Sequence, residues 1–529
     1  MAILIRNGTI VDGTGASGFI GDVLVEGDRI KEVIPSAVRL RLPTTTVETI
    51  DATGAIVSPG FIDAHTHSDA YLVIEPDAPS KISQGVTTEI NGQCGGSIAP
   101  RYGEARLSSD WAALLGERLT WRSLAEYREV LAAAKPAVNT VQFIGHNTLR
   151  SSVVGYAGRA CTPDELRRME YLLAQALDEG GWGLTTGLIY QPGKYSTPEE
   201  VVALAKVAAD RGGFYATHMR SEGDRILEAI DEVLELVRKT GIRAEISHLK
   251  TSGRKNWSKI DAVLEKMDAA VAAGELLGSD RYPFCAAGTD LDVVLPDWAQ
   301  EGAAAAECIR LADPATRARI VAEINADERD WSTVMIGGTW HEENKPFSGK
   351  RISDILCPPS PSASAFLTPG ELICDILEKD GCKTGAFFFG MSEENLAKIY
   401  SRPWVVPGSD ASLRAPWGPL GADHPHPRAY ATMPEFYRRV RALGFSREET
   451  VARMTSVPAD RFDLKGRGTI AAGAFADLVV WKEDEFRIRS TYTDPHRFTT
   501  GVKAVFVNGA LTYADGAFTG NRAGRFLGR

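Results

Sequence analysis

The middle of the chain alternates buried-type strands with amphipathic helices, and this pattern limits the fold more than any other feature. Helical runs occur at Pro163–Glu179, Pro198–Arg211 and Arg225–Thr240. Eight short apolar runs end in polar residues or a turn and are expected to be strands: Val57–His67, Val86–Asn91, Val138–Gly145, Gly183–Ile189, Phe214–His218, Ala244–His248, Leu276–Tyr282 and Trp404–Asp410. Alternating units of this kind build parallel sheets, so the pattern predicts an α/β protein with a (β/α)8 TIM-like barrel.

Both ends of the chain carry short strand-like runs separated by turn residues. Near the N-terminus, Ile3–Ile5 is followed by Asn7-Gly8, a pair that predicts a hairpin because both positions of a type I′ turn need φ > 0. Near the C-terminus, Ala476–Trp481 and Val502–Val507 are apolar, and Asn508-Gly509 follows the second run. These matching ends predict one small β-sandwich built from both chain termini.

The resulting division assigns residues 1–58 and 465–529 to the β-sandwich domain and residues 59–464 to the barrel. The stretch between the seventh and eighth expected strands is too long for one crossover. We therefore expect an inserted subdomain around residues 290–370, with the proline-rich Cys357–Pro361 run inside it.

Composition excludes several classes of protein. Hydrophobic residues make up 44% and charged residues 24% of the 529 residues, which is a globular balance and not that of a disordered chain. The net charge of −10 offers no electrostatic footprint for nucleic acid. No run approaches the ~18 apolar residues that a membrane span needs. Seven scattered cysteines without a CxxC motif favour free thiols and a cytoplasmic protein. The oligomeric state stays open.

Polar residues with metal-binding chemistry recur at the expected strand ends, where barrels of this kind place their chemistry. His65 and His67 are two residues apart on one strand, so both imidazoles can share a face. Cys94 follows the second strand, and the fifth, sixth and eighth end in His218, His248 and Asp410. Each alone could be structural, and a lone cysteine is more often a small buried hydrophobe. Together they favour a metal, and thiolate with imidazole favours zinc over magnesium or calcium.

The run Ser58–His67 resembles the first metal-binding strand of the amidohydrolase superfamily. Within it the chain is most similar to the D-aminoacylases, which are N-acyl-D-amino-acid deacylases. The similarity covers essentially the whole chain and rests on four further segments: Gly85–Thr88 through Cys94, Gly145–Arg150, His248–Lys250 and His424–Arg428. The expected fourth strand, Gly183–Ile189, has no lysine, which disfavours the hydantoinase and dihydroorotase branches that bridge two metals with a carboxylated lysine.

The resemblance also implies roles for single residues. It implies that Cys94, His218 and His248 hold one tightly bound zinc, and that His65, His67 and Asp410 form a second, weaker position. It implies that Asp410 is the catalytic base. It further implies a binding set for the substrate carboxylate made of Lys250, Tyr282, Arg428 and, more weakly, Thr289. A guanidinium such as that of Arg428 can bind a carboxylate through two hydrogen bonds.

The main interpretation is therefore zinc-dependent hydrolysis of the amide bond of small N-acyl-D-amino acids, and the preference for D-substrates comes from the resemblance alone. A dipeptidase that releases a C-terminal D-residue would use the same chemistry. From a different class, an inactive barrel could serve as a binding module.

A few other residues remain ambiguous in sequence. His146 and Arg150 could reach the pocket or brace its loop, and Cys285 could lie near the site. Arg220 and Glu222 are expected to form a local ion pair that supports the His218 loop.

Overall fold

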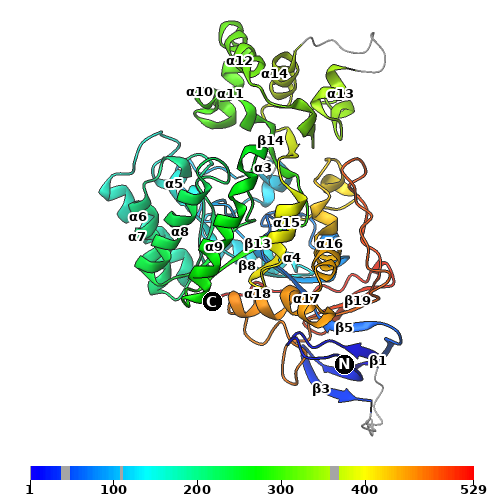
Figure 1. Cartoon of the computed structure of the whole chain (residues 1–529). Coiled ribbons are helices and arrows are strands. Elements are labelled where there is room, and N and C mark those ends of the chain that lie inside the picture. Colours follow the sequence, from blue (N-terminus) through cyan, green and yellow to red (C-terminus); the bar gives the residue numbers. More distant parts are fainter. Residues whose placement is uncertain (1, 37–47, 108–110, 358–367) are drawn as a thin grey trace.

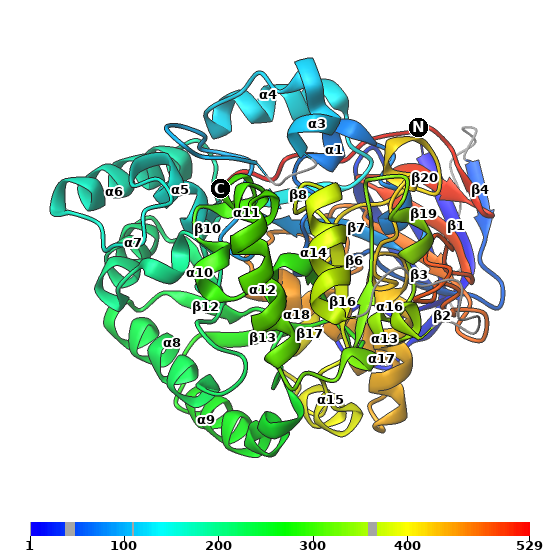
Figure 2. The ribbon, with the colours of Figure 1, turned by 90° about the horizontal axis from the view of Figure 1, so that it is seen from above.

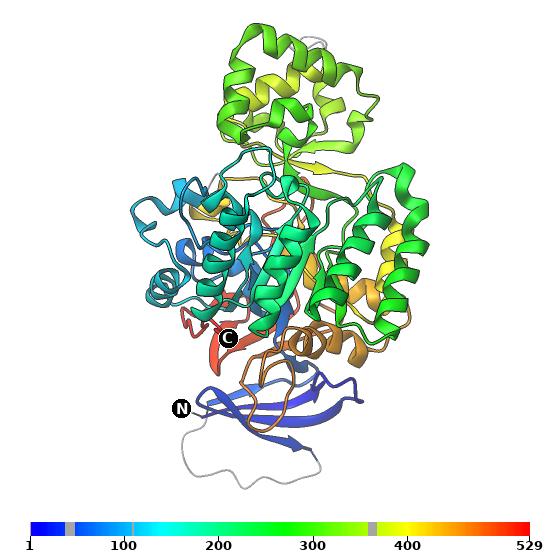
Figure 3. The ribbon, with the colours of Figure 1, turned by 90° about the vertical axis from the view of Figure 1, so that its left-hand side faces the viewer.

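The computed structural model describes residues 2–36, 48–107, 111–357 and 368–529. Figures 1 and 3 show three regions: a strand-rich end that holds the N-terminus, a central barrel surrounded by helices, and a helical lobe at the opposite end. In the described part of the chain, no helix has the length and apolar character that a bilayer crossing requires.

Eight parallel strands form the barrel, counting β8 and β9 as one interrupted strand. Their order is β6 (Phe61–Asp63), β7 (Val86–Asn91), β8 (Asn139–Gln142) with β9 (Ile144–Gly145), β10 (Gly183–Gly187), β11 (Phe214–His218), β12 (Arg243–Ile246), β13 (Leu277–Arg281) and β17 (Val405–Pro407). The ring closes between β6 and β17 through Ala64 N–H to Pro407 O (3.1 Å), Asp410 N–H to His65 O (2.8 Å) and a parallel bridge between Thr66 and Ala411. The predicted TIM-like barrel is confirmed.

The first expected strand is divided between two sheets. Its first part, β5 (Ile56–Pro59), pairs with strands of the chain termini, whereas β6 belongs to the barrel. Gly60 lies at the junction, and a Cβ there would approach Thr87 Oγ1 to 2.2 Å. The absence of a side chain at Gly60 leaves room for Thr87 where the chain passes from one sheet to the other.

Helices cover the outside of the barrel, as Figure 2 shows. Among them are α4 (Leu124–Ala134), α5 (His146–Val153), α6 (Pro163–Asp178), α7 (Pro198–Asp210), α8 (Ile226–Thr240), α9 (Ile260–Ala272), α15 (Glu393–Tyr400), α16 (Arg428–Ala442), α17 (Arg447–Met454) and α18 (Ser456–Arg461). α6 and α7 each start with proline, and the threonine before it accepts a hydrogen bond from the third backbone N–H. α8 ends at Gly241, whose φ of 68° suits a glycine C-cap.

Strands from the two chain ends form one sheet of nine strands. It contains β1 (Ala2–Ile10), β2 (Phe19–Glu26), β3 (Arg29–Pro35), β4 (Glu48–Asp51), β5, β18 (Leu478–Trp481), β19 (Val502–Val507), β20 (Ala510–Ala514) and β21 (Ala517–Phe518). Antiparallel pairing of β18 with β5 joins the two ends. Ile3 and Val23 share one hydrophobic cluster with Leu478 and Phe506, so both termini build a single core.

The hairpin prediction at Asn7-Gly8 is wrong. β1 continues through this pair, and its register against β2 shifts between Ile5 and Gly8, which is a β-bulge. Asn7 has a φ of 61°, so its left-handed conformation serves the bulge and not a turn. At Asn508-Gly509, with φ values of 47° and 78°, the same dipeptide does connect two antiparallel strands, β19 and β20.

The helical lobe spans residues 287–388 and follows β13, so it lies beyond the carboxyl ends of the barrel strands (Figure 3). An antiparallel sheet of β14 (Ala287–Asp290), β16 (Gly385–Phe388) and β15 (Val334–Ile336) connects it to the barrel. Its helices, which pack on a separate hydrophobic core, are α10 (Asp297–Gln300), α11 (Ala303–Ala312), α12 (Pro314–Ala326), α13 (Ile352–Leu356) and α14 (Pro369–Lys379). The lobe includes the region 290–370, although Pro358–Pro361 lie outside the described residues.

Candidate metal centre

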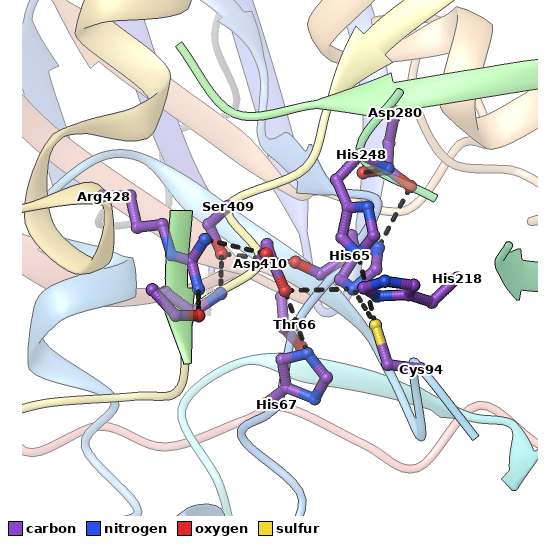
Figure 4. A network of polar contacts seen from close by, with 12 residues as sticks. His65, Thr66, His67, Cys94, His218, His248, Asp280, Ser409, Asp410 and Arg428 are labelled. Carbon is purple, nitrogen blue, oxygen red and sulfur yellow. Dashed lines mark hydrogen bonds and ion pairs between the residues drawn. The ribbon is translucent and has the colours of Figure 1, made fainter. Parts of the chain in front are cut away.

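Metal-competent side chains from five of the eight barrel strands converge at the carboxyl edge of the barrel (Figure 4). They lie at the ends of β6, β7, β11, β12 and β17 or in the segments that follow. Their ligand atoms form two overlapping groups, each within 4.8 Å: His65, His67, Cys94 and Asp410 in one, and Cys94, His218 and His248 in the other. The structure thus brings together all six residues that the sequence places at strand ends.

The Cys94 sulfur lies between the two groups. It is 3.4 Å from Nε2 of His65 and 3.4 Å from Nε2 of His248. On the other side, Asp410 Oδ1 is 3.1 Å from His67 Nε2 and 3.4 Å from His65 Nε2. His67 keeps 29% of its side chain exposed and Asp410 keeps 12%, so this side of the centre is open to a small molecule.

Carboxylates behind the imidazoles fix the ring orientations. Asp280 Oδ2 is 3.1 Å from His65 Nδ1, and its other oxygen accepts the backbone N–H of His248 at 2.9 Å. Glu222 Oε1 is 3.0 Å from His248 Nδ1. Both contacts use Nδ1 and leave Nε2 directed at Cys94, the arrangement in which partners of metal-binding histidines normally hold the ring.

Three residues of the centre have strained backbones. Cys94, His248 and Asp410 have φ values of 53°, 38° and 50°, in the left-handed region that non-glycine residues rarely occupy. Such strain persists only where the surrounding structure enforces it, and it gathers at functional sites.

The donor set fits zinc. A thiol sulfur and imidazole nitrogens are the ligands that zinc prefers. His218 is 4% exposed, and within the described part of the chain neither of its ring nitrogens makes a hydrogen bond. Buried polar groups are normally hydrogen-bonded, so a bound ion would supply a close partner to His218, whose Nε2 lies 3.5 Å from Glu222 without a hydrogen bond.

Comparison with known proteins places this chain in a family. The amidohydrolase family model matches residues 48–354 and 376–513. D-aminoacylase of Alcaligenes xylosoxydans xylosoxydans is 32% identical, over 100% of this chain and 97% of that protein. This chain belongs to the amidohydrolase family.

Two solved structures of this amidohydrolase's relatives match it over 100% of this chain and 99% of theirs. One is a D-aminoacylase described by its binuclear metal center, with 32% identity and a TM-score of 0.81. The other is N-acyl-D-glutamate deacylase from Bordetella bronchiseptica, complexed with zinc and a phosphonate inhibitor, with 31% identity and a TM-score of 0.81.

Cys94 and Asp410 of the amidohydrolase centre are both ionised in the folded chain. Burial opposes ionisation of Cys94, but the neighbouring His65 and His248 lower the pKa of its thiol well below the usual value. Burial likewise opposes ionisation of Asp410, but Arg428 and His248 lower the pKa of that carboxyl well below its usual range. Cys94 and Asp410 are therefore anions, and although burial opposes protonation of the nearby rings, these anions raise the pKa of His67 and of His248 to about 9. A metal that binds here would replace the ring protons, and thiolate is the form of cysteine that it would meet.

The residues expected to bind the substrate carboxylate lie beside the centre. Arg428 donates to Asp410 Oδ2 at 2.7 Å and to Gly288 O at 3.1 Å. The buried Tyr282 ring has the Arg428 guanidinium carbon 4.7 Å and Lys250 Nζ 5.8 Å from its centroid. Thr289 is partly exposed on β14, at the base of the lobe. The arrangement places two cations and a phenol at one edge of the centre.

The predicted ion pair between Arg220 and Glu222 is wrong. Arg220 reaches α8 and makes two hydrogen bonds to Glu232, at 3.0 and 2.9 Å. Glu222 turns toward the centre instead, where its carboxylate accepts a hydrogen bond from Lys250 at 2.5 Å and lies 3.5 Å from His218 Nε2. Sequence spacing alone does not show that Arg220 points outward to α8 while Glu222, two residues later, points toward the metal centre.

Tyr190 lies beside the centre and was not predicted from sequence. Its ring centroid is 4.9 Å from that of His218. Tyr190 follows β10 by three residues, so its place after the fourth barrel strand was the available signal.

The ambiguous candidates have structural roles. His146 Nε2 is 2.8 Å from Glu200 Oε1, and Arg150 donates to Glu200 Oε2 at 2.5 Å, so both residues brace α5 against α7. Burial raises the pKa of Cys285 to about 12, which leaves it a neutral thiol and a poor nucleophile.

Proposed function

We propose that this chain is a zinc-dependent hydrolase of N-acyl-D-amino acids that releases a carboxylate and the free D-amino acid. The observation that carries the proposal is the Cys94, His218 and His248 group next to His65, His67 and Asp410 at the open end of the barrel. Relatives with D-aminoacylase and N-acyl-D-glutamate deacylase activity in their names support the substrate class.

In this proposal Cys94, His218 and His248 hold one tightly bound zinc, and His65, His67 and Asp410 form a second, weaker position. The zinc-containing relative supports this metal. When bound, zinc would lower the pKa of water from about 15.7 to about 7 and polarise the amide carbonyl.

Asp410 acts as the general base and then as the general acid. Its carboxylate takes the proton of the attacking water, the carbon–nitrogen bond breaks, and the same proton passes to the leaving amine. Transfer of this kind typically contributes about 10²- to 10⁴-fold to a rate. Lys250, Tyr282, Arg428 and Thr289 are proposed to receive the carboxylate of the substrate.

The proposal is tested by amine release from paired N-acetyl-D- and N-acetyl-L-amino acids with zinc supplied. We expect turnover of D-substrates alone, and loss of turnover in Asp410→Asn. L-selective turnover would contradict the substrate class. Silence of zinc-loaded protein on this panel, with cleavage of peptides that end in a D-residue, would establish a dipeptidase instead.

We also infer a cytoplasmic location. All seven cysteines lie within the described residues as free thiols, which agrees with a reducing compartment. A thiol count of seven on freshly isolated, denatured protein would support this inference, and a lower count would contradict it.

A further inference from the structure

The strands that carry His65, His67 and Asp410 meet where the barrel closes. β6 and β17 are joined there by a few main-chain contacts, among them Asp410 N–H to His65 O at 2.8 Å. Asp410 itself has the left-handed φ of 50°. A strained conformation persists only where neighbouring groups enforce it. The segment around Asp410 therefore needs contacts that hold it against β6.

A completely buried lysine lies against this closure. Lys81 belongs to α2 (Pro79–Ile82), and its ammonium donates to Ser409 Oγ at 3.0 Å and to Ala411 O at 3.1 Å. These two residues flank Asp410 on both sides. Lys81 therefore holds Asp410 indirectly, through the Ser409 hydroxyl on one side and the Ala411 carbonyl on the other.

Two buried carboxylates hold the lysine in turn. Lys81 Nζ is 2.9 Å from Asp63 Oδ2 and 3.1 Å from Glu89 Oε1. Asp63 also accepts the Ser409 backbone N–H at 2.8 Å through its other oxygen. The lysine and Asp63 thus bind Ser409 from two directions, and they join the end of the first barrel strand, β6, to the segment that follows the last, β17.

The chemistry of this cluster favours a positioning role over simple stabilisation. Moving charges out of water is expensive, and apolar residues of similar volume often stabilise a core as well or better. A buried lysine is a poor choice for stability alone, but its three N–H donors fix the directions of several oxygen atoms at once.

We propose that Lys81 is a positioning residue for amide hydrolysis: through Ser409 and Ala411 it holds Asp410 at hydrogen-bond distance from His65 and His67. This rests on the proposed role of Asp410 as the proton-transferring base. Without the lysine, Asp410 leaves its left-handed conformation, and proton transfer and the second metal position are weakened together.

The test compares Lys81→Met, the charge-matched double variant Lys81→Met/Asp63→Asn, and the milder Ser409→Ala. We expect kcat to fall by about 10- to 100-fold in both lysine variants, with little change in KM, since displacements near 1 Å have effects of this size. Ser409→Ala should lose a smaller fraction of kcat. The double variant should recover melting temperature but not kcat, and recovery of both would overturn the proposal.

Metal titration provides a readout that does not need turnover. We expect Lys81→Met to retain one tightly bound zinc per chain but to bind a second zinc at least about tenfold more weakly than the unmodified chain. Unchanged second-site affinity together with unchanged kcat would overturn the proposal. If the unmodified chain shows no amide hydrolysis, the proposed function fails, while this titration still decides the role of Lys81.

Arg467→Met is the control for destabilisation. Arg467 forms a buried ion pair with Asp477 in the terminal sheet and donates to Asn508 at 2.9 Å, remote from the centre. It should lower the melting temperature with kcat unchanged. A loss of kcat in Arg467→Met equal to that in Lys81→Met would show that the lysine effect is general destabilisation, and would overturn the proposal.

Discussion

Replacement of Glu222 by glutamine should weaken both zinc binding and the recognition of the substrate carboxylate. Glu222 Oε1 accepts a hydrogen bond from Lys250 at 2.5 Å and lies 3.0 Å from His248 Nδ1. Burial opposes its ionisation, but His218, Lys250 and His248 lower the pKa of its carboxyl well below the usual value. The wild-type residue is therefore an anion that orients one proposed ligand and one proposed substrate-binding cation.

The size of the effect follows from these contacts. A hydrogen bond to a charged group contributes about 1.5–3 kcal/mol, and glutamine keeps the shape but removes the charge. Changes of this kind behind a metal ligand usually weaken metal affinity or activity by about 10- to 100-fold. The two ranges agree, since a tenfold change corresponds to about 1.4 kcal/mol.

The assay measures zinc affinity by competition with a chelator and KM for paired substrates. We expect Glu222→Gln to bind zinc about 10- to 100-fold more weakly. KM should rise more for a free carboxylate than for the same substrate capped as an amide, because Lys250 loses its anchor.

Glu232→Gln is the matched control, because it breaks the Arg220 ion pair, whose side chains are 23% and 22% exposed. Partly exposed pairs of this kind contribute about 0–1 kcal/mol, so zinc affinity should not change. Wild-type zinc affinity in Glu222→Gln, or equal losses in both variants, would show that Glu222 does not hold His248 for zinc.

Three further predictions follow from the same geometry. Asp410→Asn should abolish turnover and keep the tightly bound zinc; loss of that zinc as well would make Asp410 chiefly a ligand. Arg428→Ala should raise KM for free carboxylates far more than for amide-capped substrates, and equal rises would contradict its role. Burial alone would raise the pKa of Glu200, but the stronger effect of His146 and Arg150 lowers it from 4.5 to about 2. Because the folded pKa is depressed, this contribution of about 3 kcal/mol is present above pH 4.5 and is lost as pH falls toward 2. Urea unfolding of metal-free protein should show this loss, and Glu200→Gln should flatten it; parallel pH profiles would disprove the assignment.

Much of the fold could be predicted from sequence because its signals are local. The helices at α6, α7 and α8 lie within one residue of their expected ends, since their caps and apolar periodicity belong to the segments themselves. The barrel brings the carboxyl ends of its strands to one edge. Residues as distant as Cys94 and Asp410 could therefore be placed near each other without knowledge of any contact.

The errors occur where a local pattern has two structural solutions. Asn7-Gly8 and Asn508-Gly509 are the same dipeptide and both asparagines have a positive φ, but only the second glycine does, and the first pair sits in a bulge and the second in a turn. The difference comes from the strands that pair on either side, and a dipeptide does not contain that information. The break of the first expected strand at Gly60 likewise depends on the approach of Thr87, 27 positions later in the sequence.

The barrel, the positions of the six metal-competent residues and the family could be predicted from sequence, because they depend on periodicity, strand ends and motif. The pairing of the charged groups could not, because it depends on the folded chain. Glu222 turns to His248 and Lys250, and Lys81 reaches across to Ser409 and Ala411. Ion pairing in a core depends on distance and burial in the folded chain. Sequence alone therefore does not predict contacts between residues more than 300 positions apart, such as Lys81 and Ser409.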